Sequence, residues 1–460
     1  MNLQFKELLN VQNCQIEFKG KPEILEQFIS GFSIDSRTIK SNEIFVAIKG
    51  DKFDGHQFIP EAQLSGVQVC IVSRSWYESQ TEKPGGNYFI VKDTLIGFQE
   101  ISRYYRLKFN IPMLALTGSN GKTTTKEMIA AVLGQKYRML KNQGNLNNHI
   151  GVPLSLLELT AEHDMAVIEM GTNHFGEIAR LAKIAHPTCG LITNVGPAHL
   201  EFFGSLEGVY KAKSELWQFL EQYGQIAFIN ADDKLLGKNL PSVTKVVTYG
   251  FENSAQVQGI FLGLDGEGRS SFSVNNTEIN LGIVGMHNIY NALAAVAVGL
   301  EFDLNMKQIK VALENFLPSS KRMEVIRKKG LIIINDCYNS NPESARKSLL
   351  TLSQMQTKGK RIAVLADMLE LGKWSESEHQ GIGEYVVSLG NIGHLLTYGP
   401  LSRLTVQQTE NMGMRTAIHF EDKMELINCL KRIIAEGDLL LIKGSRGMVM
   451  EEVVSGLIQG

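Results

Sequence analysis

Cysteine is scarce in this sequence, and its cysteines form no pattern. The five cysteines are odd in number and widely scattered, and no Cys-x-x-Cys pair occurs: Cys14, Cys70, Cys189, Cys337 and Cys429. This arrangement argues against a disulfide framework. We therefore expect reduced thiols in a cytoplasmic protein, with each cysteine packed as a small apolar residue.

Long hydrophobic runs and an excess of one charge are also missing. The most apolar stretches, residues 292–300 and 439–442, are far shorter than the roughly 20 residues that span a bilayer. Residues 1–7 lack the charged segment and apolar core of a signal peptide, so we expect none. The 46 Lys and Arg residues against 48 Asp and Glu residues give a formal charge of -2, and no Lys/Arg-rich run occurs. We expect no nucleic-acid partner.

What is present is the composition of a globular protein with several cores. The chain has 460 residues, of which 43% are hydrophobic and 20% charged. Because domains usually contain roughly 100–200 residues, two to four are expected, and three is the natural number. We predict an N-terminal domain over residues 1–108, a central domain over residues 109–317 and a C-terminal domain over residues 318–460.

The central and C-terminal stretches predict α/β folds. Apolar runs that stop at polar residues alternate there with helix-length segments. In the central stretch these runs are residues 113–117, 165–170, 190–194 and 225–230, and in the C-terminal stretch residues 331–335, 361–365, 394–397, 416–420 and 438–442. Such alternation predicts mainly parallel sheets, whose ligands gather beyond the carboxyl ends of the strands. The N-terminal stretch mixes short strands at 43–48 and 67–72 with turns and a helix at 95–107, which predicts a smaller α/β domain.

A glycine-containing loop between a strand and a helix is the strongest local signal. It reads Thr117-Gly118-Ser119-Asn120-Gly121-Lys122-Thr123-Thr124. Glycines let backbone N–H groups approach phosphate oxygens, and the following helix N-terminus adds partial positive charge. Lys122 can reach the outer phosphates, and the Thr123 hydroxyl can ligate Mg²⁺. The commonest P-loop pattern would place glycine at position 116, where this chain has leucine. A helix-capping turn is the alternative, but the context favours a phosphate site.

Three further residues are candidates on weaker grounds. Glu169 ends a predicted strand, where a carboxylate beside the phosphate loop could hold Mg²⁺. His199 follows another predicted strand, and a lone loop histidine is more often a surface or capping residue. Lys213 lies in a helical segment close to Lys211, and the spacing alone does not distinguish either lysine from a solvated one.

Several stretches together resemble the Mur ligases, the ATP-dependent enzymes that build the peptide of the bacterial cell-wall precursor. The central stretches are residues 117–127, 144–148, 169–172, 194–200, 212–215 and 285–292. Residues 34–37 and 50–56 resemble the family's UDP-sugar domain. Within the family, residues 336–344, 366–372 and 443–448 resemble the branch that adds D-alanyl-D-alanine. The resemblance covers essentially the whole chain in the expected order, and it implies an N-terminal UDP-substrate domain, a central P-loop-type ATP-binding domain and a C-terminal Rossmann-like ligase domain.

The resemblance implies a role for each candidate residue. It places ATP at the loop from Gly118 to Thr124, adenine near Asn288 and Asn291, ribose near Asp336, and phosphate or the acyl intermediate near Asn339. It implies that Thr123 and Glu169 hold one Mg²⁺ and that His199 and Lys213 help to hold a second, with Lys213 carbamylated. It places the UDP-linked substrate near Ser36, Arg37, Asn145 and Thr172. Lys122, Glu169, His199 and Lys213 form the implied catalytic set, while Lys211, His149 and Cys337 are expected to have no chemical role.

The implied activity is peptide ligation in peptidoglycan synthesis, and hence in cell-wall biogenesis, cell shape and cell division. UDP-N-acetylmuramoyl-tripeptide would be activated as an acyl phosphate and joined to D-alanyl-D-alanine by a cytoplasmic enzyme, which we expect to be a monomer. Residues 318–320 are a candidate hinge, although an ordinary loop is an equal alternative. The alternatives for function are a sibling ligase that adds a single amino acid, a folate polyglutamate synthase, or a nucleotide-dependent switch without catalysis.

Overall fold

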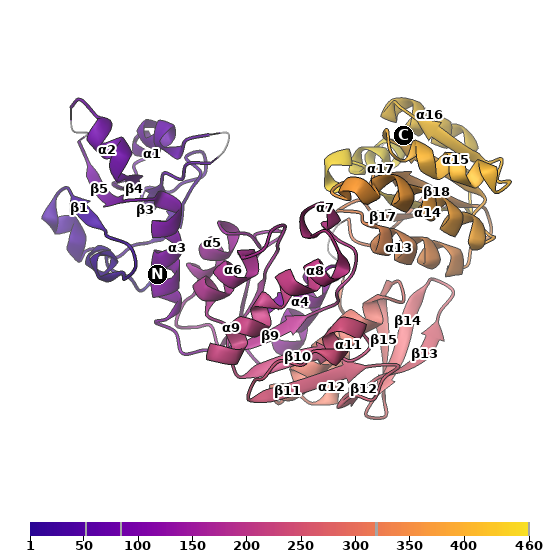
Figure 1. The fold of residues 1–460 in the computed structure, drawn as a ribbon, viewed down its shortest axis with the longest axis horizontal. Helices are drawn as coiled ribbons and strands as arrows, with labels where there is room; N and C mark the ends of the chain where they lie inside the picture. The colour runs from indigo at the N-terminus through magenta and orange to yellow at the C-terminus, as the bar shows by residue number, and fades with distance from the viewer. Residues whose placement is uncertain (51–52, 83–84, 318–320, 459–460) are drawn as a thin grey trace.

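The computed structural model describes residues 1–50, 53–82, 85–317 and 321–458. In Figure 1 the N-terminal part of the chain stands apart to one side, whereas the C-terminal part lies against the central part. Four sheets organise these parts, and they contain five, seven, three and six strands in chain order. No helix in the described ranges is both long and apolar enough to cross a membrane.

The N-terminal sheet has five short strands in the order β1-β5-β4-β3-β2. They are β1 (Glu17–Lys19), β2 (Gly31–Ser33), β3 (Glu43–Val46), β4 (Val69–Ser73) and β5 (Asn87–Val91). Only β1 runs antiparallel to its neighbour. Helices α1 (Ile59–Leu64) and α2 (Arg74–Ser79) belong to this part, and α3 (Thr94–Arg106) leads into the central part. The runs predicted at 43–48 and 67–72 form β3 and β4.

The central sheet has seven parallel strands in the order β12-β11-β10-β9-β6-β8-β7. They are β6 (Met113–Thr117), β7 (Met139–Lys141), β8 (Met165–Glu169), β9 (Cys189–Ile192), β10 (Ile226–Asn230), β11 (Lys245–Gly250) and β12 (Val257–Gln258). Met113 and Ala115 of β6 pack into one hydrophobic core, and Leu114 and Leu116 pack into another. Burial on both faces explains why the strand is apolar throughout.

Helices cover both faces of this sheet. The helices of this part, up to α11, are α4 (Lys122–Leu133), α5 (Gly151–Leu156), α6 (Glu177–Ala185), α7 (Leu200–Phe203), α8 (Leu206–Lys213), α9 (Glu215–Tyr223), α10 (Lys234–Lys238) and α11 (Asn288–Glu301), of which α7 and α8 form a small cluster of their own beside the sheet. Strand β6 lies between β8 and β9, with Leu116 opposite Glu169 and Thr117 opposite Ile192. The residues that follow these three strands therefore meet at one edge of the sheet, where parallel sheets bind ligands.

A small antiparallel sheet was not predicted from the sequence. Its strands β13 (Ile260–Leu264), β14 (Arg269–Val274) and β15 (Thr277–Val284) form a meander, and helix α12 (Met306–Glu314) follows α11. Asn275 and Asn276 connect β14 to β15 with φ angles of 47° and 58°. Asparagine tolerates this left-handed conformation, which the tight turns of hairpins require.

The C-terminal sheet has the order β16-β17-β21-β18-β19-β20, and only β16 is antiparallel. The strands are β16 (Glu324–Lys328), β17 (Leu331–Asp336), β18 (Arg361–Ala366), β19 (His394–Tyr398), β20 (Ala417–Phe420) and β21 (Leu439–Lys443). The helices are α13 (Pro342–Gln354), α14 (Ser375–Ser388), α15 (Arg403–Asn411), α16 (Lys423–Ile433) and α17 (Glu451–Ile458). Separate cores lie on the two faces of the sheet.

The predicted α/β fold with mainly parallel sheets is confirmed. The limits of the three domains stay predictions. The candidate hinge at residues 318–320 lies outside the described residues, as do residues 51–52 of the stretch that resembles the UDP-sugar domain.

Candidate active site

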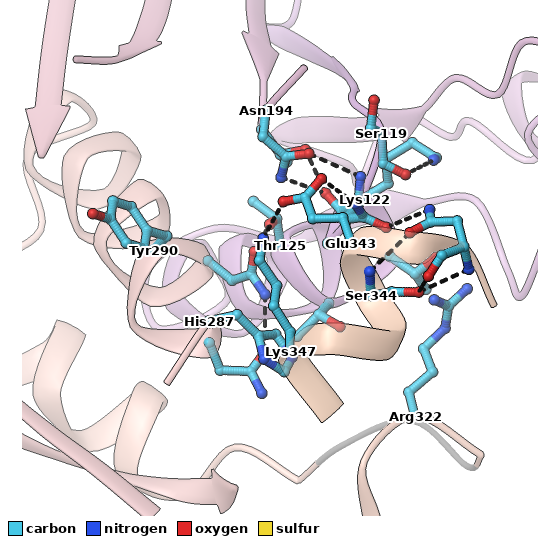
Figure 2. Close-up of a pocket in the computed structure, with 18 of the residues that line it drawn as sticks. Ser119, Lys122, Thr125, Asn194, His287, Tyr290, Arg322, Glu343, Ser344 and Lys347 are labelled. Carbon is cyan, nitrogen blue, oxygen red and sulfur yellow. Dashed lines mark hydrogen bonds and ion pairs between the residues drawn. The ribbon is translucent and has the colours of Figure 1, made fainter. Parts of the chain in front are cut away.

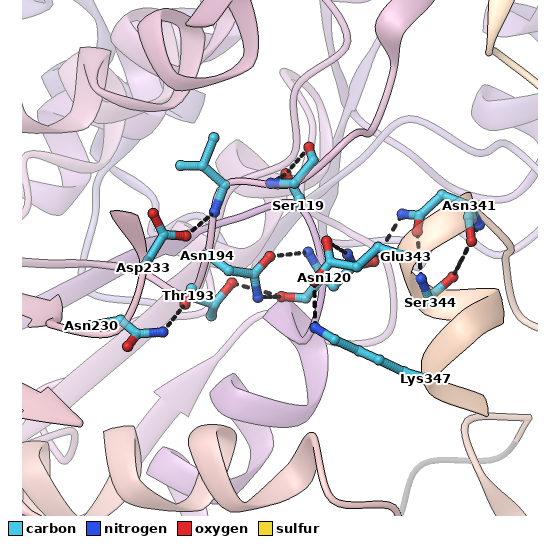
Figure 3. Close-up of polar contacts among 12 residues, drawn as sticks. Ser119, Asn120, Thr193, Asn194, Asn230, Asp233, Asn341, Glu343, Ser344 and Lys347 are labelled. Carbon is cyan, nitrogen blue, oxygen red and sulfur yellow. Dashed lines mark hydrogen bonds and ion pairs between the residues drawn. The ribbon is translucent and has the colours of Figure 1, made fainter. Parts of the chain in front are cut away.

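The loop after β6 is held in place by hydrogen bonds to the residues that follow the neighbouring strand β9. Ser119 Oγ both accepts a hydrogen bond from Gly196 N and donates one to Gly196 O, each at 2.9 Å. Asn120 N donates to Asn194 Oδ1 at 3.0 Å, and Asn194 Nδ2 donates back to Asn120 O at 3.0 Å (Figure 3). Thr193 Oγ1 also donates to Asn120 O, at 2.6 Å. The segment after β9 therefore fixes the loop without using the backbone N–H groups at the start of α4.

Two glycines in the loop occupy positions where a side chain would collide. A Cβ atom on Gly118, whose φ is +155°, would lie 1.8 Å from Thr193 Oγ1. A Cβ atom on Gly121, whose φ is +79°, would lie 2.4 Å from Asn291 Oδ1. Gly121 caps the N-terminus of α4, so its backbone can approach a phosphate closely.

Asn288 and Asn291 extend from α11 to the first turn of α4. Thr125 Oγ1 donates to Asn291 Oδ1 at 3.1 Å, and Asn291 Nδ2 donates to Asn288 Oδ1 at 2.9 Å. Asn288 Nδ2 in turn donates to Val284 O at 2.8 Å. This chain fixes both amides beside the loop, in the region that the resemblance links to adenine.

Glu169 ends β8 with one satisfied carboxylate oxygen and one that has no hydrogen bond. Asn147 Nδ2 donates to Oε1 at 2.8 Å, and the Glu169 backbone pairs with the amide of Asn142. Oε2 is buried without a hydrogen-bond partner among the described residues, and the nearest cation, Lys126 Nζ, is 3.8 Å away. A buried carboxylate oxygen is costly to leave unpaired, so this atom is suited to a cation that binds from the cavity.

Lys122 and Lys213 approach the same part of the loop from different helices. Lys122 Nζ donates to Gly118 O at 2.8 Å, and Lys213 Nζ donates to that oxygen at 3.0 Å. Lys213 is only 2% exposed. Burial and the positive charge of Lys122 hold the pKa of Lys213 well below its usual value, so its amine is neutral far more readily than a solvated one. The exposed Lys211 instead lies over the ring of Phe175.

His199 lies at the start of α7, where the central and C-terminal parts meet. Its φ angle is 52°, in the left-handed region. Its Nδ1 atom lies 2.6 Å from Oε2 of Glu370, in the turn after β18. The other predicted metal ligands, Thr123, Glu169 and Lys213, are on the central part with it.

The C-terminal part contributes a buried ion pair. Lys443 Nζ lies 2.6 Å from Asp336 Oδ2 and donates to Asn339 O at 3.0 Å. Ser348 Oγ also donates to Asp336 Oδ2, at 2.7 Å. Cys337 is buried, and its thiol donates to Ile442 O, as expected of a structural residue.

Helix α13 docks directly on the phosphate loop. Asn120 Nδ2 donates to Glu343 Oε2 at 2.9 Å, and Asn341 Nδ2 donates to Asn120 Oδ1 at 2.8 Å (Figure 3). Lys347 forms an ion pair with Glu343 one helical turn away. Both halves of the Asn120 amide therefore bind the C-terminal part, while its backbone binds the central part.

These elements enclose a cavity of about 650 Å³ (Figure 2). It is lined by most of the predicted site residues: Ser119, Asn120, Gly121, Lys122, Thr123, Thr124, Asn145, Glu169, Thr172, His199, Asn288, Asn291, Asp336 and Asn339. Gly118 and Lys213 are not part of the lining. Gly118 O accepts hydrogen bonds from both Lys122 Nζ and Lys213 Nζ. Ser36 and Arg37 belong to the N-terminal part, where Ser36 donates to Glu61 and Arg37 pairs with Asp35.

The cavity also contains residues that sequence reasoning did not single out. Arg322 stacks on the ring of Tyr338 at 3.7 Å and faces the cavity, and Lys347 and Tyr290 line it as well (Figure 2). Tyr290 OH donates to Asp232 Oδ2 at 3.0 Å. Lys443 was noticed only as part of a family stretch. No local pattern marked Arg322, since a single arginine beside a predicted loop is usually solvated.

The side chains at this site suit a hard divalent cation such as Mg²⁺ only if Thr123 and a modified Lys213 are included among its ligands. No cluster of three or more His, Cys, Asp and Glu side chains among the described residues is placed to hold a metal ion. Glu169 nevertheless has a buried oxygen without a hydrogen-bond partner among the described residues. The lowered pKa of Lys213 favours its neutral amine, which as a carbamate would supply an oxygen ligand. Oxygen ligands are what Mg²⁺ prefers. The site therefore has the residues for phosphate and cation binding on one wall and polar residues of the C-terminal part on the other.

Comparison with protein families gives three matches along the chain. The model described as Mur ligase family, catalytic domain matches residues 28–101. The Mur ligase middle domain matches residues 116–299, and the Mur ligase, glutamate ligase domain matches residues 321–446.

Similar proteins cover nearly the whole chain. UDP-N-acetylmuramoyl-tripeptide--D-alanyl-D-alanine ligase of Bacillus subtilis is 35% identical, over 98% of this chain and 98% of its own. The protein of the same name from Escherichia coli is 38% identical, over 93% and 94%. Among solved structures, MurF from Acinetobacter baumannii has a TM-score of 0.88 at 29% identity and covers 99% of both chains. MurF ligase from Thermotoga maritima, in complex with ADP, has a TM-score of 0.81 at 28% identity and covers 94% of this chain and 97% of its own.

Proposed function

The chain belongs to the Mur ligase family, and we propose that it joins D-alanyl-D-alanine to UDP-N-acetylmuramoyl-tripeptide with the conversion of ATP to ADP and phosphate. The observation that carries this proposal is the cavity in which a phosphate loop faces polar residues of the C-terminal part. The near full-length similarity to ligases of this name supports the choice of substrates. The product would be the pentapeptide precursor of peptidoglycan.

ATP would bind with its phosphates on the loop from Gly118 to Thr124. Lys122 lines the cavity, where its charge can stabilise the phosphoryl group during transfer. The adenine would lie near Asn288 and Asn291 and the ribose near Asp336, all of which line the same cavity.

We propose that the remaining polar residues of the site bind Mg²⁺. Thr123 and Glu169 would hold one ion, and His199 with a carbamylated Lys213 would help to hold a second. A bound Mg²⁺ supplies charge stabilisation to the transferring phosphoryl group. The neutral amine of Lys213 is the form that adds to CO₂, and its burial against Gly118 supports this assignment.

Peptide-bond formation requires an activated carboxylate. The terminal carboxylate of the tripeptide would attack the γ-phosphorus of ATP to form an acyl phosphate. The amine of D-alanyl-D-alanine would then attack the acyl carbon and expel phosphate through a tetrahedral intermediate. Water must be kept out because it would hydrolyse the acyl phosphate. The docking of α13 on Asn120 would help to exclude water, because it places the C-terminal part directly against the phosphate loop.

The larger substrate would extend from the N-terminal part to the cavity. Ser36 and Arg37 would contact its UDP end, and Asn145 and Thr172 its peptide end, since the latter pair lines the cavity. We propose that the enzyme acts as a cytoplasmic monomer.

The test is phosphate release measured with each substrate omitted in turn. We expect turnover only when ATP, UDP-N-acetylmuramoyl-tripeptide and D-alanyl-D-alanine are all present, and none from a Lys122→Ala variant. Replacing D-alanyl-D-alanine with single amino acids, or the UDP substrate with a folate, separates the proposal from a sibling ligase and a folate polyglutamate synthase. ADP formation without an amine substrate, or unchanged turnover in Lys122→Ala, would overturn it.

A further inference from the structure

We propose that Glu370 is a positioning residue that fixes the ring of His199, so that the C-terminal part orients a cation ligand of the central part. The inference rests on the proposed function, in which His199 helps to hold a divalent cation. It assigns to Glu370 a role that the cavity itself does not reveal, because Glu370 is not among the residues that line it.

The contact between the two side chains is short and specific. His199 Nδ1 lies 2.6 Å from Glu370 Oε2, and the His199 side chain is only 22% exposed. Nδ1 is buried, and no other acceptor for it is found among the described residues. Glu370 Oε2 is therefore the partner for this nitrogen.

The backbone on both sides of the contact is built to bring the two residues together. His199 and Glu370 have φ angles of 52° and 62°, which residues other than glycine adopt at a cost. Glu201 N also donates to Glu370 O at 3.4 Å, parallel to the side-chain contact. Gly372, with φ of 53°, lies so close to Glu201 that an added Cβ atom would be 3.2 Å from its Cα. Backbone strain at both residues of one contact points to a functional role for that contact.

The chemistry of imidazole explains what the contact does for His199. A carboxylate that accepts a hydrogen bond from Nδ1–H fixes the tautomer that leaves the Nε2 lone pair free. His199 lines the cavity, so the free Nε2 is the atom available to a cation there. Glu370 fixes both the tautomer and the plane of the ring, and it belongs to the turn after β18 rather than to the sheet that holds His199. Cation binding at His199 therefore depends on docking of the C-terminal part.

The first measurement reads the ring directly in the metal-free protein. Nitrogen-15 NMR of histidine-labelled protein at a pH where the ring is neutral distinguishes the two tautomers, and a His199→Asn variant identifies the His199 signals among the ten histidines. We expect the Nδ1–H tautomer in the wild type, a shift toward Nε2–H in Glu370→Ala, and partial recovery in Glu370→Gln, whose amide oxygen can still accept. Glu376→Ala is the matched control, because Glu376 is an exposed glutamate nearby in the same segment.

The second measurement reads cation binding. Electron paramagnetic resonance of Mn²⁺ with a non-hydrolysable ATP analogue should show that Glu370→Ala weakens one bound ion by roughly 10- to 100-fold, the usual effect of losing such a partner. The concentration of Mg²⁺ needed for half-maximal activity should rise similarly. In His199→Asn, the additional Glu370→Ala change should have little further effect, because Glu370 acts through His199.

These outcomes separate the inference from the function on which it rests. Unchanged tautomer and unchanged Mn²⁺ affinity in Glu370→Ala, with normal ligation by the wild type, would overturn the role of Glu370 and leave the ligase intact. Additive losses in the double variant would also overturn it, since Glu370 would then act independently of His199. Absence of ligation by the wild type would overturn the proposed function instead.

Discussion

Lys122 and Lys213 share one acceptor, since both side-chain nitrogens donate to the carbonyl oxygen of Gly118, at 2.8 Å and 3.0 Å. Two ammonium groups this close repel each other, and burial adds to the cost. The pKa of Lys213 is therefore held well below its usual value, by burial first and by Lys122 second. The pair is stable because Lys213 can lose its proton, and the neutral amine that results is the reactive form.

Replacing Lys213 tests its assigned role. We expect Lys213→Ala to be largely inactive, with activity partly restored by short carboxylates such as acetate, because these could supply the lost oxygen ligand. The assay is phosphate release with all three substrates. Lys211→Ala is the control, since Lys211 is exposed two residues earlier on the same helix. A fully active Lys213→Ala enzyme would contradict the carbamate.

Gly118 should not tolerate a side chain. In Gly118→Ala, the new methyl group would lie 1.8 Å from Thr193 Oγ1, at a φ of +155° that alanine rarely adopts. We expect the loop to be displaced and binding of an ATP analogue, measured by calorimetry, to weaken by at least about tenfold, which corresponds to roughly 1.4 kcal/mol. Adding Thr193→Ala removes the clash but not the backbone strain, so it should restore binding only in part. Normal binding by Gly118→Ala would show that the loop is not held as described.

The sequence was sufficient to predict the phosphate loop because its signal is local. Residues 113–117 form β6, as predicted from the apolar run, and the helix expected after the loop is α4. The clustering of Glu169 with the loop also followed from a general rule, since the ends of neighbouring parallel strands meet at one sheet edge.

Other features depend on contacts between distant segments and could not be predicted from the residues alone. Lys213 is distinguished from Lys211 only by burial against Gly118, which requires the packed fold. The contact of Arg322 with Tyr338 and that of Glu370 with His199 are likewise tertiary. The antiparallel hairpin of β14 and β15 did have a local signal, the Asn275-Asn276 turn, which was overlooked.

Asn120 links the phosphate loop to α13, and reversing one of its hydrogen bonds should weaken that link. In Asn120→Asp, a carboxylate would face Glu343 Oε2, to which Asn120 Nδ2 now donates at 2.9 Å. Two carboxylates at this distance repel each other, so we expect slower turnover and a larger radius of gyration in small-angle X-ray scattering.

Glu343→Gln supplies the compensating change for this prediction. In the double variant a neutral amide faces the new carboxylate and can donate to it, so compactness and part of the activity should return. Glu343→Gln alone should preserve the contact, because its amide oxygen can still accept from Asn120. If Asn120→Asp were as compact and active as the wild type, the docking of α13 would not depend on this amide.

His287 should make the protein sensitive to acid. Burial lowers the pKa of His287 to about 4, and the positive charge of Lys347 lowers it further against the opposing effect of Asp336. A histidine in the unfolded chain has a pKa of about 6.5. Between about pH 6.5 and pH 4 the unfolded chain therefore binds a proton at this residue that the folded protein does not bind. The stabilisation from the neutral ring is complete above pH 6.5 and is lost as the pH falls toward 4. Its full size is roughly 3 to 4 kcal/mol, of which slightly less than about 3 kcal/mol is lost between pH 7 and pH 4.

His287→Asn removes this titration and should flatten the acid side of the stability profile. Urea denaturation at several pH values between 4 and 7 should show that the wild type loses about 2 to 3 kcal/mol more than the variant over this range. His174→Asn is the control, because the His174 side chain is 62% exposed and its loss should leave the profile unchanged. Parallel profiles for the wild type and His287→Asn would mean that His287 is protonated in the folded protein. Such a result would place a positive charge near Lys347 and Lys443, and the charges of both lysines oppose it.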